Sequence, residues 1–234
     1  MDLIQALAAE LGKDPRHVEN VVHLLDEGNT IPFIARYRKE LHGAMDDTSL
    51  RTLEERLQYL RGLEERREAV KKSIDEQGKL TDELAAAIDS AKTLAEVEDL
   101  YRPYKQKRRT RATMAKEKGL EPLAALLFAQ ERDCPRLEEA ARDFVDPEKG
   151  VETVEDALQG ASDIIAEQIS DDAAIRKSLR ALISRQGQLV SRAATEDDSV
   201  YRLYYDFTQS VARLQGHQVL AINRGEKEGI LKVS

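Results

Sequence analysis

The longest regular pattern of apolar residues lies between residues 46 and 78. Apolar residues recur there at steps of three or four, with one change of phase, at Leu50, Leu53, Leu57, Leu60, Leu63, Val70 and Ile74. This spacing places their side chains on one face of a helix. Asp46 and Asp47 supply carboxylates at the start of that helix, and Gly78 supplies its end. The pattern therefore predicts one long helix, on which shorter helices would pack.

Helical spacing of apolar residues continues on both sides of the long helix. Two helices are predicted before it that end at Gly12 and at Gly28, and a third runs from Pro32 to Leu41. After the long helix, one helix begins at Thr81. The remaining predicted helices run from Thr93 to Tyr101, Arg111 to Lys118, Glu121 to Glu131, Pro135 to Phe144, Thr153 to Ile169 and Asp172 to Arg185. The first two helices, joined at Asp14-Pro15, have the outline of a helix-turn-helix. Their low positive charge favours a hairpin that only packs over one that reads DNA.

The pattern changes after residue 187. Leu189-Val190 predicts a short strand, and residues 217–223 and 229–234 predict two strands around a glycine-containing turn. The predicted fold is mainly α: an elongated multi-helix assembly around one long central helix, with a helix-turn-helix-like N-terminal part and a short β-hairpin at the C-terminal end. Three regions are expected, at 1–78, 79–187 and 188–234. The last would lead into a missing downstream domain, so we expect the N-terminal piece of a longer protein.

Composition indicates a globular protein, because 34% of the 234 residues are charged and 41% are apolar. A single cysteine, Cys134, excludes an internal disulfide and a cysteine-rich metal site. The sequence shows neither a long apolar run nor a basic-then-apolar leader, so we expect a cytoplasmic protein without a membrane partner. A net charge of −8 opposes indiscriminate coating of nucleic acid, but a local basic patch could still bind.

The strongest local feature is the segment YRPYKQKRRTR at residues 101–111, which holds six basic residues and no acidic residue. Pro103 interrupts the helix before it, so we expect an ordered loop. Arginine and lysine bind phosphate, and a tyrosine ring can stack on an unpaired base. The candidate nucleic-acid-binding residues are Arg102, Tyr104, Lys105, Lys107, Arg108, Arg109 and Arg111. The same charges could instead neutralise the acidic faces of neighbouring helices.

Four blocks of sequence resemble, in order, the N-terminal region of the Tex family of bacterial RNA-binding transcription accessory proteins. They are IPFIARYRKE at 31–40, LEER at 53–56, DLYRPYKQKRRTRATMAKEKGLEPLA at 99–124 and LAINRGEKEGIL at 220–231. In that family an RNase H-like domain, tandem helix-hairpin-helix motifs and a C-terminal OB fold follow, and none of them is present in this sequence. The resemblance implies a role in transcription. The implied partners are RNA or DNA, which this chain would bind weakly, and RNA polymerase or other transcription machinery.

Catalysis finds little support in the sequence. His17 and His23 are six residues apart and would not face one another on a helix, and His42 and His217 are isolated. No glycine-rich phosphate loop, nucleophile elbow or zinc spacing is present. We therefore expect no enzyme, no cofactor and no metal. Two hypotheses are left: a helical module that contributes to nucleic-acid binding and scaffolding, or a structural and protein-interaction module without nucleic-acid contact.

Overall fold

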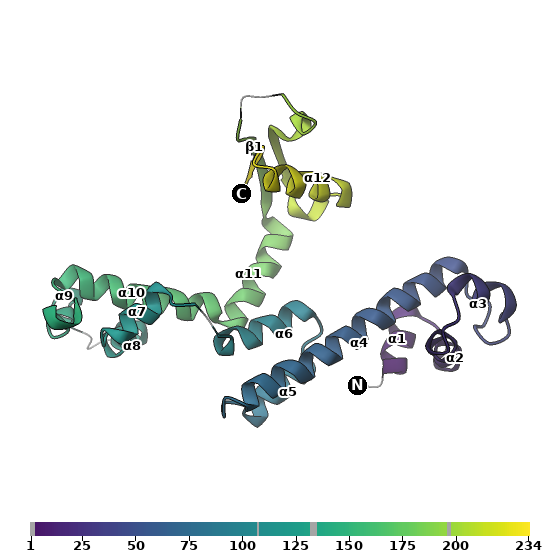
Figure 1. Ribbon diagram of the computed structural model, residues 1–234, viewed down its shortest axis with the longest axis horizontal. Helices are drawn as coiled ribbons and strands as arrows, with labels where there is room; N and C mark the ends of the chain where they lie inside the picture. The colour runs from purple at the N-terminus through teal and green to yellow at the C-terminus, as the bar shows by residue number, and fades with distance from the viewer. Residues whose placement is uncertain (1–2, 107, 132–134, 196–197) are drawn as a thin grey trace. The chain divides into compact units, whose positions relative to one another are not determined.

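The computed structural model describes residues 3–106, 108–131, 135–195 and 198–234. The chain forms two compact units, Met1–Tyr104 and Lys105–Ser234 (Figure 1). Helices dominate both units, and the second unit also contains a small antiparallel sheet near the end of the chain. The mainly α fold with a small β element is therefore confirmed, whereas the division at residues 78 and 187 stays a prediction.

The first unit contains six α-helices among its described residues. They are α1 (Leu3–Leu11), α2 (Pro15–Asp26), α3 (Ile31–Tyr37), α4 (Asp47–Asp75), α5 (Asp82–Ser90) and α6 (Leu94–Tyr101), followed by the 3-10 turn η1 (Arg102–Tyr104). Helix α4 is the predicted long helix. Its 29 residues correspond to about 44 Å at 1.5 Å per residue. At its start, the Asp46 side chain accepts a hydrogen bond from the backbone N–H of Ser49 at 2.8 Å.

Helix α4 contributes one apolar face to two successive cores. Leu50, Leu53 and Leu57 pack with buried residues of α1, α2 and α3 in the first core. Val70 and Ile74 pack with Ile88 of α5 and Val97 of α6 in the second. In this arrangement α1 and α2 form the expected hairpin, and its apolar side chains face the first core. Their use as a DNA-reading motif stays a hypothesis.

Helix α3 ends at Tyr37, so the prediction that it reaches Leu41 was wrong. Arg38 leaves the helical conformation, with φ −131° and ψ 38°, and turns follow it. The carbonyl oxygen of Leu41 accepts a hydrogen bond from Asn20 Nδ2 at 3.1 Å and lies 3.0 Å from His17 Nδ1. These contacts attach the turns to α2, and the sequence spacing alone gives no sign of them.

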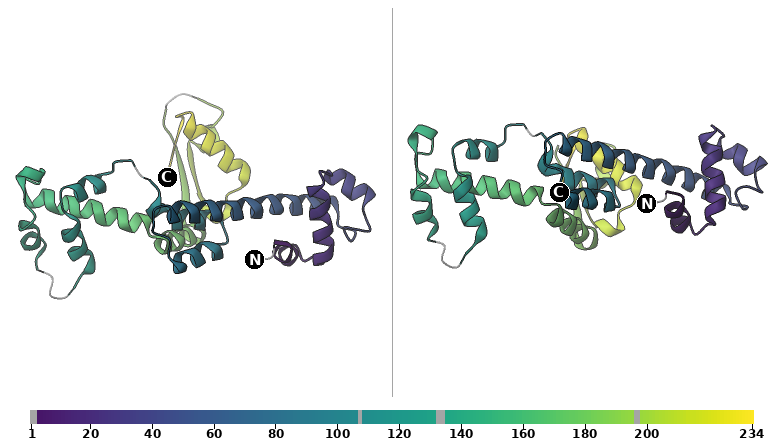
Figure 2. Two further views of the ribbon diagram at one scale, coloured as in Figure 1. Left: turned by 60° about the horizontal axis from the view of Figure 1, so that its bottom comes forward. Right: turned by 90° about the horizontal axis from the view of Figure 1, so that it is seen from below.

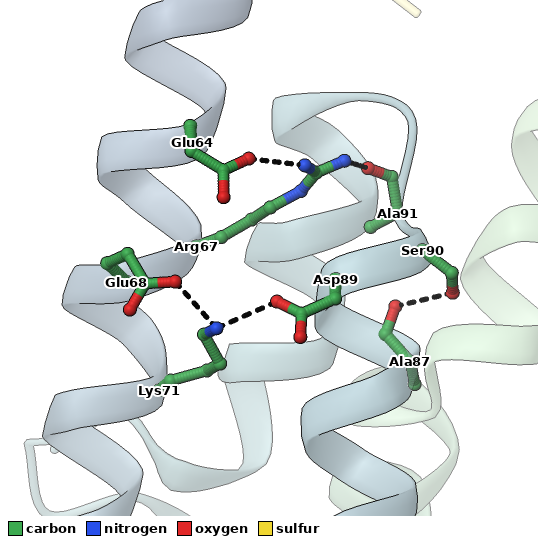
Figure 3. Close-up of polar contacts among 8 residues, drawn as sticks. All are labelled: Glu64, Arg67, Glu68, Lys71, Ala87, Asp89, Ser90 and Ala91. Atoms are coloured by element: carbon green, nitrogen blue, oxygen red, sulfur yellow. Dashed lines mark hydrogen bonds and ion pairs between the residues drawn. The ribbon is translucent and has the colours of Figure 1, made fainter. Parts of the chain in front are cut away.

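Polar contacts also join α4 to α5 and to Ala91, the residue that follows α5 (Figure 3). The Arg67 guanidinium lies 2.7 Å from Glu64 and donates to the carbonyl oxygen of Ala91. Lys71 lies between Glu68 at 2.6 Å and Asp89 at 2.8 Å, and the hydrogen bonds that it donates, first to Asp89 and then to Glu68, raise its pKa. The second core is thus bordered by ion pairs whose partners come from both helices.

The second unit begins with helices that surround α10. They are α7 (Arg111–Glu117), α8 (Glu121–Ala129), α9 (Leu137–Arg142) and α10 (Val154–Asp171), with the 3-10 turn η2 (Pro147–Lys149) before α10. Helices α7, α8 and α9 all contact α10 (Figure 2). At Gly160 of α10, an added Cβ would overlap Leu120 Cδ1 and lie 3.3 Å from Ala115 Cβ. Packing therefore favours glycine there.

The unit continues with α11 (Ala173–Gln186), β1 (Gln188–Ala193), η3 (Arg202–Tyr204), β2 (Asp206–Ser210), η4 (Val211–Arg213), α12 (Gly216–Lys227) and β3 (Leu231–Val233). The sheet has the order β2-β1-β3, with both pairs antiparallel. Strand β1 includes the predicted Leu189-Val190, and β3 lies inside the predicted strand at 229–234. Both of these strand predictions are confirmed.

The prediction of a strand at residues 217–223 was wrong, because these residues lie in α12. The side chains of Gln215 and Gln218 form a capping box that starts this helix. Gly225, which suggested a turn, is buried within the helix because β3 packs against it. A Cβ there would lie 2.6 Å from Leu231 Cδ1. Tertiary packing therefore explains the glycine that the sequence pattern assigned to a hairpin turn.

Candidate nucleic-acid interface

The boundary between the two units falls between Tyr104 and Lys105, inside the predicted basic segment. Arg102 and Tyr104 belong to the first unit, whereas Lys105, Arg108, Arg109 and Arg111 belong to the second. Lys107 lies outside the described residues. The structure therefore divides the candidate residues into two groups, each held by its own unit.

In the first unit, η1 ends helix α6 and carries Arg102 and Tyr104. Arg102 is exposed, whereas Tyr104 is half-buried against the second core of α4, α5 and α6. The Tyr104 carbonyl oxygen accepts a hydrogen bond from Gln77 Nε2 at 3.0 Å. A tyrosine that packs on a core offers a base less of its ring than an exposed tyrosine does. Tyr104 is thus mainly a packing residue in this structure.

The preceding Tyr101 has a similar role. Its hydroxyl lies 3.0 Å from the Ser73 hydroxyl, and the Arg66 guanidinium lies 5.4 Å from its ring centroid. Arg66 also pairs with Glu98 at 2.6 Å, and the hydrogen bond to that carboxylate raises the pKa of Arg66. Tyr101 is consequently held among side chains of α4 and α6.

In the second unit, Thr110 fixes the point where the basic segment enters α7. Its side-chain oxygen accepts a hydrogen bond from the Thr113 backbone N–H at 3.0 Å, which caps the helix. The same hydroxyl donates to Glu167 Oε1 of α10 at 3.0 Å. Because Glu167 comes from α10, the start of α7 is attached to the helix at the centre of the bundle. The end of the basic segment, at residues 108–111, is therefore attached to that helical bundle through Thr110.

Two of the candidate arginines face carboxylates. Arg109 lies 2.7 Å from Glu117, and Arg111 lies 3.9 Å from Asp163. Both arginine side chains are largely exposed, so these ion pairs are expected to contribute little to stability. Lys105 and Arg108 are exposed and, among the residues that the structure describes, have no ion-pair or hydrogen-bond partner. Among the described residues of the second unit, the segment thus combines two paired and two unpaired cations.

The sequence pattern did not identify the carboxylate partners or the neighbouring lysines. Glu117 lies at the end of the helix that Arg111 begins, and Asp163 approaches only because α10 packs on α7. Lys118 donates to the Gly150 carbonyl oxygen at 2.7 Å, and Lys116 lies 3.5 Å from Glu121. Lys116 and Lys118, five and seven residues after Arg111, were a signal that could have extended the prediction to α7.

Neither a metal-binding cluster nor a membrane-spanning helix is found in the part of the chain that the structure describes. Within residues 3–106, 108–131, 135–195 and 198–234, no group of three or more His, Cys, Asp or Glu side chains could hold a metal ion. Cys134 lies outside these ranges. In the same ranges, no helix combines the length and the apolar character needed to cross a membrane.

Two family models match the chain. The Tex-like protein N-terminal domain matches residues 1–75, and the Tex central region-like model matches residues 134–234. The basic segment lies between these two matches.

Curated relatives are similar over almost all of the chain. Protein YhgF of Escherichia coli (strain K12) is 48% identical over 231 residues, which cover 97% of this chain and 30% of the relative. Transcriptional accessory protein Tex of Neisseria gonorrhoeae is 42% identical over 238 residues, which cover 100% of this chain and 31% of the relative. S1 RNA-binding domain-containing protein 1 of Homo sapiens is 31% identical over 243 residues, which cover 99% of this chain and 24% of the relative. The chain spans about a third or less of the length of these relatives.

Proposed function

Because the chain belongs to the Tex family, we propose that it is a helical module that contributes to RNA or DNA binding and to scaffolding in transcription. The printed names of two relatives, a transcriptional accessory protein and an S1 RNA-binding domain-containing protein, support this direction. The proposal places the module in the cytoplasm and gives it no catalytic role. RNA polymerase or another part of the transcription machinery is the protein partner that it includes.

One observation carries the nucleic-acid part of the proposal. Lys105 and Arg108 are exposed and, in the part of the chain that the structure describes, unpaired, and the segment around them contains no acidic residue. Residues 101–111, with six basic residues and no acidic one, are a local concentration of positive charge in a chain with a net charge of −8. Two unpaired cations beside two weakly paired ones form a local site for phosphate, whereas the overall charge prevents indiscriminate binding.

The paired arginines can join such a site at small cost. The Arg109–Glu117 and Arg111–Asp163 pairs are exposed, and pairs of this kind contribute between about 0 and 1 kcal/mol. A phosphate accepts a forked hydrogen bond from a guanidinium as a carboxylate does, so it can replace Glu117 as the partner of Arg109. With the four described cations of the second unit engaged, log K would fall with log salt at a slope of about −3 for a single strand.

Charge reversal at the two unpaired residues tests the proposal. The double variant Lys105→Glu/Arg108→Glu should bind labelled single-stranded RNA and DNA at least about tenfold more weakly at low salt, measured by fluorescence anisotropy. Lys72→Glu/Lys79→Glu is the matched control, because it changes the net charge equally at exposed positions in and after α4. If both double variants lose affinity equally, or if neither does, the segment is not the binding site.

The alternative is a structural or protein-interaction module that touches no nucleic acid. The observation that favours it is the pairing of Arg109 with Glu117 and of Arg111 with Asp163, because both cations then neutralise carboxylates of the chain itself. In that case the chain should not bind single-stranded RNA or DNA at a salt concentration of about 50 mM, where charge attraction is only weakly screened. Purified RNA polymerase should still be retained on the immobilised chain.

A further inference from the structure

Helix α3 and the turn after it present an exposed aromatic ring among cations in the first unit. The helix packs Ile31 and Ile34 into the first core, at the opposite end of α4 from α5 and α6 (Figure 1). Tyr37 is the last residue of α3 and is 57% exposed. Among the described residues, its hydroxyl has no hydrogen-bond partner. The side chain therefore lies on the surface, and the core holds the opposite side of the helix.

Neighbouring side chains hold the Tyr37 ring in place. Phe33 lies one helical turn earlier, with its ring centroid 5.3 Å from that of Tyr37. The Arg36 guanidinium lies 6.0 Å from the Tyr37 ring centroid. Arg38 lies 5.4 Å from the Phe33 ring centroid and donates to the Tyr37 carbonyl oxygen at 3.3 Å. A guanidinium beside a ring keeps its charge and N–H groups available for an anion.

Two cations of this cluster have no carboxylate partner. Arg36 and Lys39 are exposed, and within the described ranges neither forms an ion pair or a hydrogen bond. Two carboxylates that follow in the sequence are engaged elsewhere, because Asp46 caps α4 and Asp47 lies 2.7 Å from Arg51. The charges of Arg36 and Lys39 are therefore not neutralised by those two carboxylates.

The combination of a ring and unpaired cations fits one class of ligand. A tyrosine ring stacks on the face of an unpaired base, while arginine and lysine bind the adjacent phosphates. A duplex keeps the faces of its bases stacked on one another, so only a single strand offers both groups. Glu40 is exposed beside Lys39, which limits the anionic part of the site to a short stretch of backbone.

We propose that Arg36, Tyr37 and Lys39 form a second contact for single-stranded nucleic acid, in which one base stacks on Tyr37. The inference shares the ligand class of the proposed function but rests on residues of the first unit, whereas Lys105 and Arg108 belong to the second. Two cations act here, in place of the four in the basic segment. This contact is therefore the weaker one, and its test measures stacking and not total affinity.

A fluorescent reporter tests the stacking directly on the whole chain. The chain contains no tryptophan, so Tyr37→Trp introduces a single indole at an exposed position. Single-stranded RNA or DNA of about six nucleotides should quench its emission at least about twofold, and the same sequence as a duplex should not. Phe128→Trp is the matched control, because Phe128 is 53% exposed and residues 121–131 contain no basic residue. Equal quenching by the duplex, or in the control, would overturn the proposal.

The same reporter tests the two cations. In the Tyr37→Trp chain, Arg36→Gln/Lys39→Gln should lower the affinity measured by quenching at least about fivefold at low salt. Lys72→Gln/Lys79→Gln removes the same charge at exposed positions of the same unit and should leave that affinity unchanged. Circular dichroism should show native helix content in each variant. Native affinity in the variant without Arg36 and Lys39 would refute the proposal.

A second measurement avoids the introduced indole. In the Lys105→Glu/Arg108→Glu chain, the remaining binding of single-stranded RNA should depend on the ring at position 37. Tyr37→Leu should weaken it at least about fivefold in fluorescence anisotropy, whereas Tyr37→Phe, which keeps the ring, should not. Equal affinity of these two variants would contradict stacking.

The two nucleic-acid sites can fail separately. If the Tyr37→Trp emission is unchanged and Lys105→Glu/Arg108→Glu abolishes binding, the basic segment is the site and the present inference alone is wrong. If quenching persists and Lys105→Glu/Arg108→Glu binds like the native chain, the basic segment is not the site and this inference stands. If no oligonucleotide quenches the indole but Tyr37→Leu releases RNA polymerase, the surface is a protein contact and the proposal is wrong.

Discussion

Replacing Gly160 by alanine is expected to destabilise the second unit, although the same replacement stabilises most helix interiors. Alanine gains about 1 kcal/mol over glycine in a helix. At Gly160, however, the new methyl group would overlap Leu120 Cδ1 and lie 3.3 Å from Ala115 Cβ. Leu120 is fully buried, so it has little room to move. Overpacking of this kind costs about 1–3 kcal/mol, and the expected net effect is a loss of about 1 kcal/mol.

The overlap predicts a strong coupling between the two positions. Leu120→Ala alone should cost about 2–5 kcal/mol, because it leaves a cavity in the core. In that background the Gly160→Ala methyl group no longer meets Leu120, so the change should stabilise by about 1 kcal/mol. The expected coupling energy from a double-mutant cycle is therefore about 2 kcal/mol.

Native-state hydrogen exchange is a suitable assay, because it measures the free energy of opening separately for each helix. Amides of α10 report on the Gly160 variants. Gly62→Ala in α4 is the control, since no atom lies within 4 Å of a Cβ built there, and the amides of α4 should become about 1 kcal/mol more protected. If Gly160→Ala protects α10 as Gly62→Ala protects α4, then α10 does not approach Leu120 as described.

Three further predictions concern individual contacts. The Arg61 hydrogen bond holds the pKa of Asp26 below its usual range, so the pair should stabilise the fold above about pH 4 and lose this effect as the pH falls through the folded pKa. Because both side chains are nearly half exposed, Arg61→Gln should cost less than about 1 kcal/mol at pH 7 and flatten the acid limb of urea unfolding. His42 is buried, and among the described residues neither ring nitrogen has a hydrogen-bond partner, so His42→Leu should keep or raise the melting temperature; a large drop would reveal a missing partner. Gly225→Val should loosen β3, seen as faster amide exchange in Leu231–Val233, because its side chain would collide with Leu231; unchanged exchange would contradict that packing.

The helices of this chain were largely predictable because their signals are local. The long helix α4 begins after Asp46, and its apolar residues keep helical spacing with one change of phase, so local sequence signals were enough to predict it. Residues 217–223 were not predictable in the same way. Their two flanking glycines suggest turns, and only the packing of Leu231 against Gly225 explains why a helix tolerates one there. The end of α3 at Tyr37 likewise depends on contacts from α2 to the Leu41 carbonyl oxygen.

In the candidate site, too, some features follow from the sequence and others depend on tertiary packing. The cluster of cations is a property of the sequence, and the presence of Lys105 and Arg108 follows from it directly. Whether a cation is paired depends on which helices pack together. Asp163 faces Arg111 only because α10 packs on α7, and Tyr104 is half-buried because η1 packs on the second core. Sequence alone therefore predicted a candidate phosphate-binding segment and could not show which of its side chains are unpaired.

The salt dependence of RNA binding tests the central claim most directly. The native chain should bind single-stranded RNA with a slope of log K against log salt near −3, and Lys105→Glu/Arg108→Glu should reduce the magnitude of that slope by about 1.4. This change corresponds to the loss of two phosphate contacts. An identical slope and affinity in the native chain and the double variant would contradict the account.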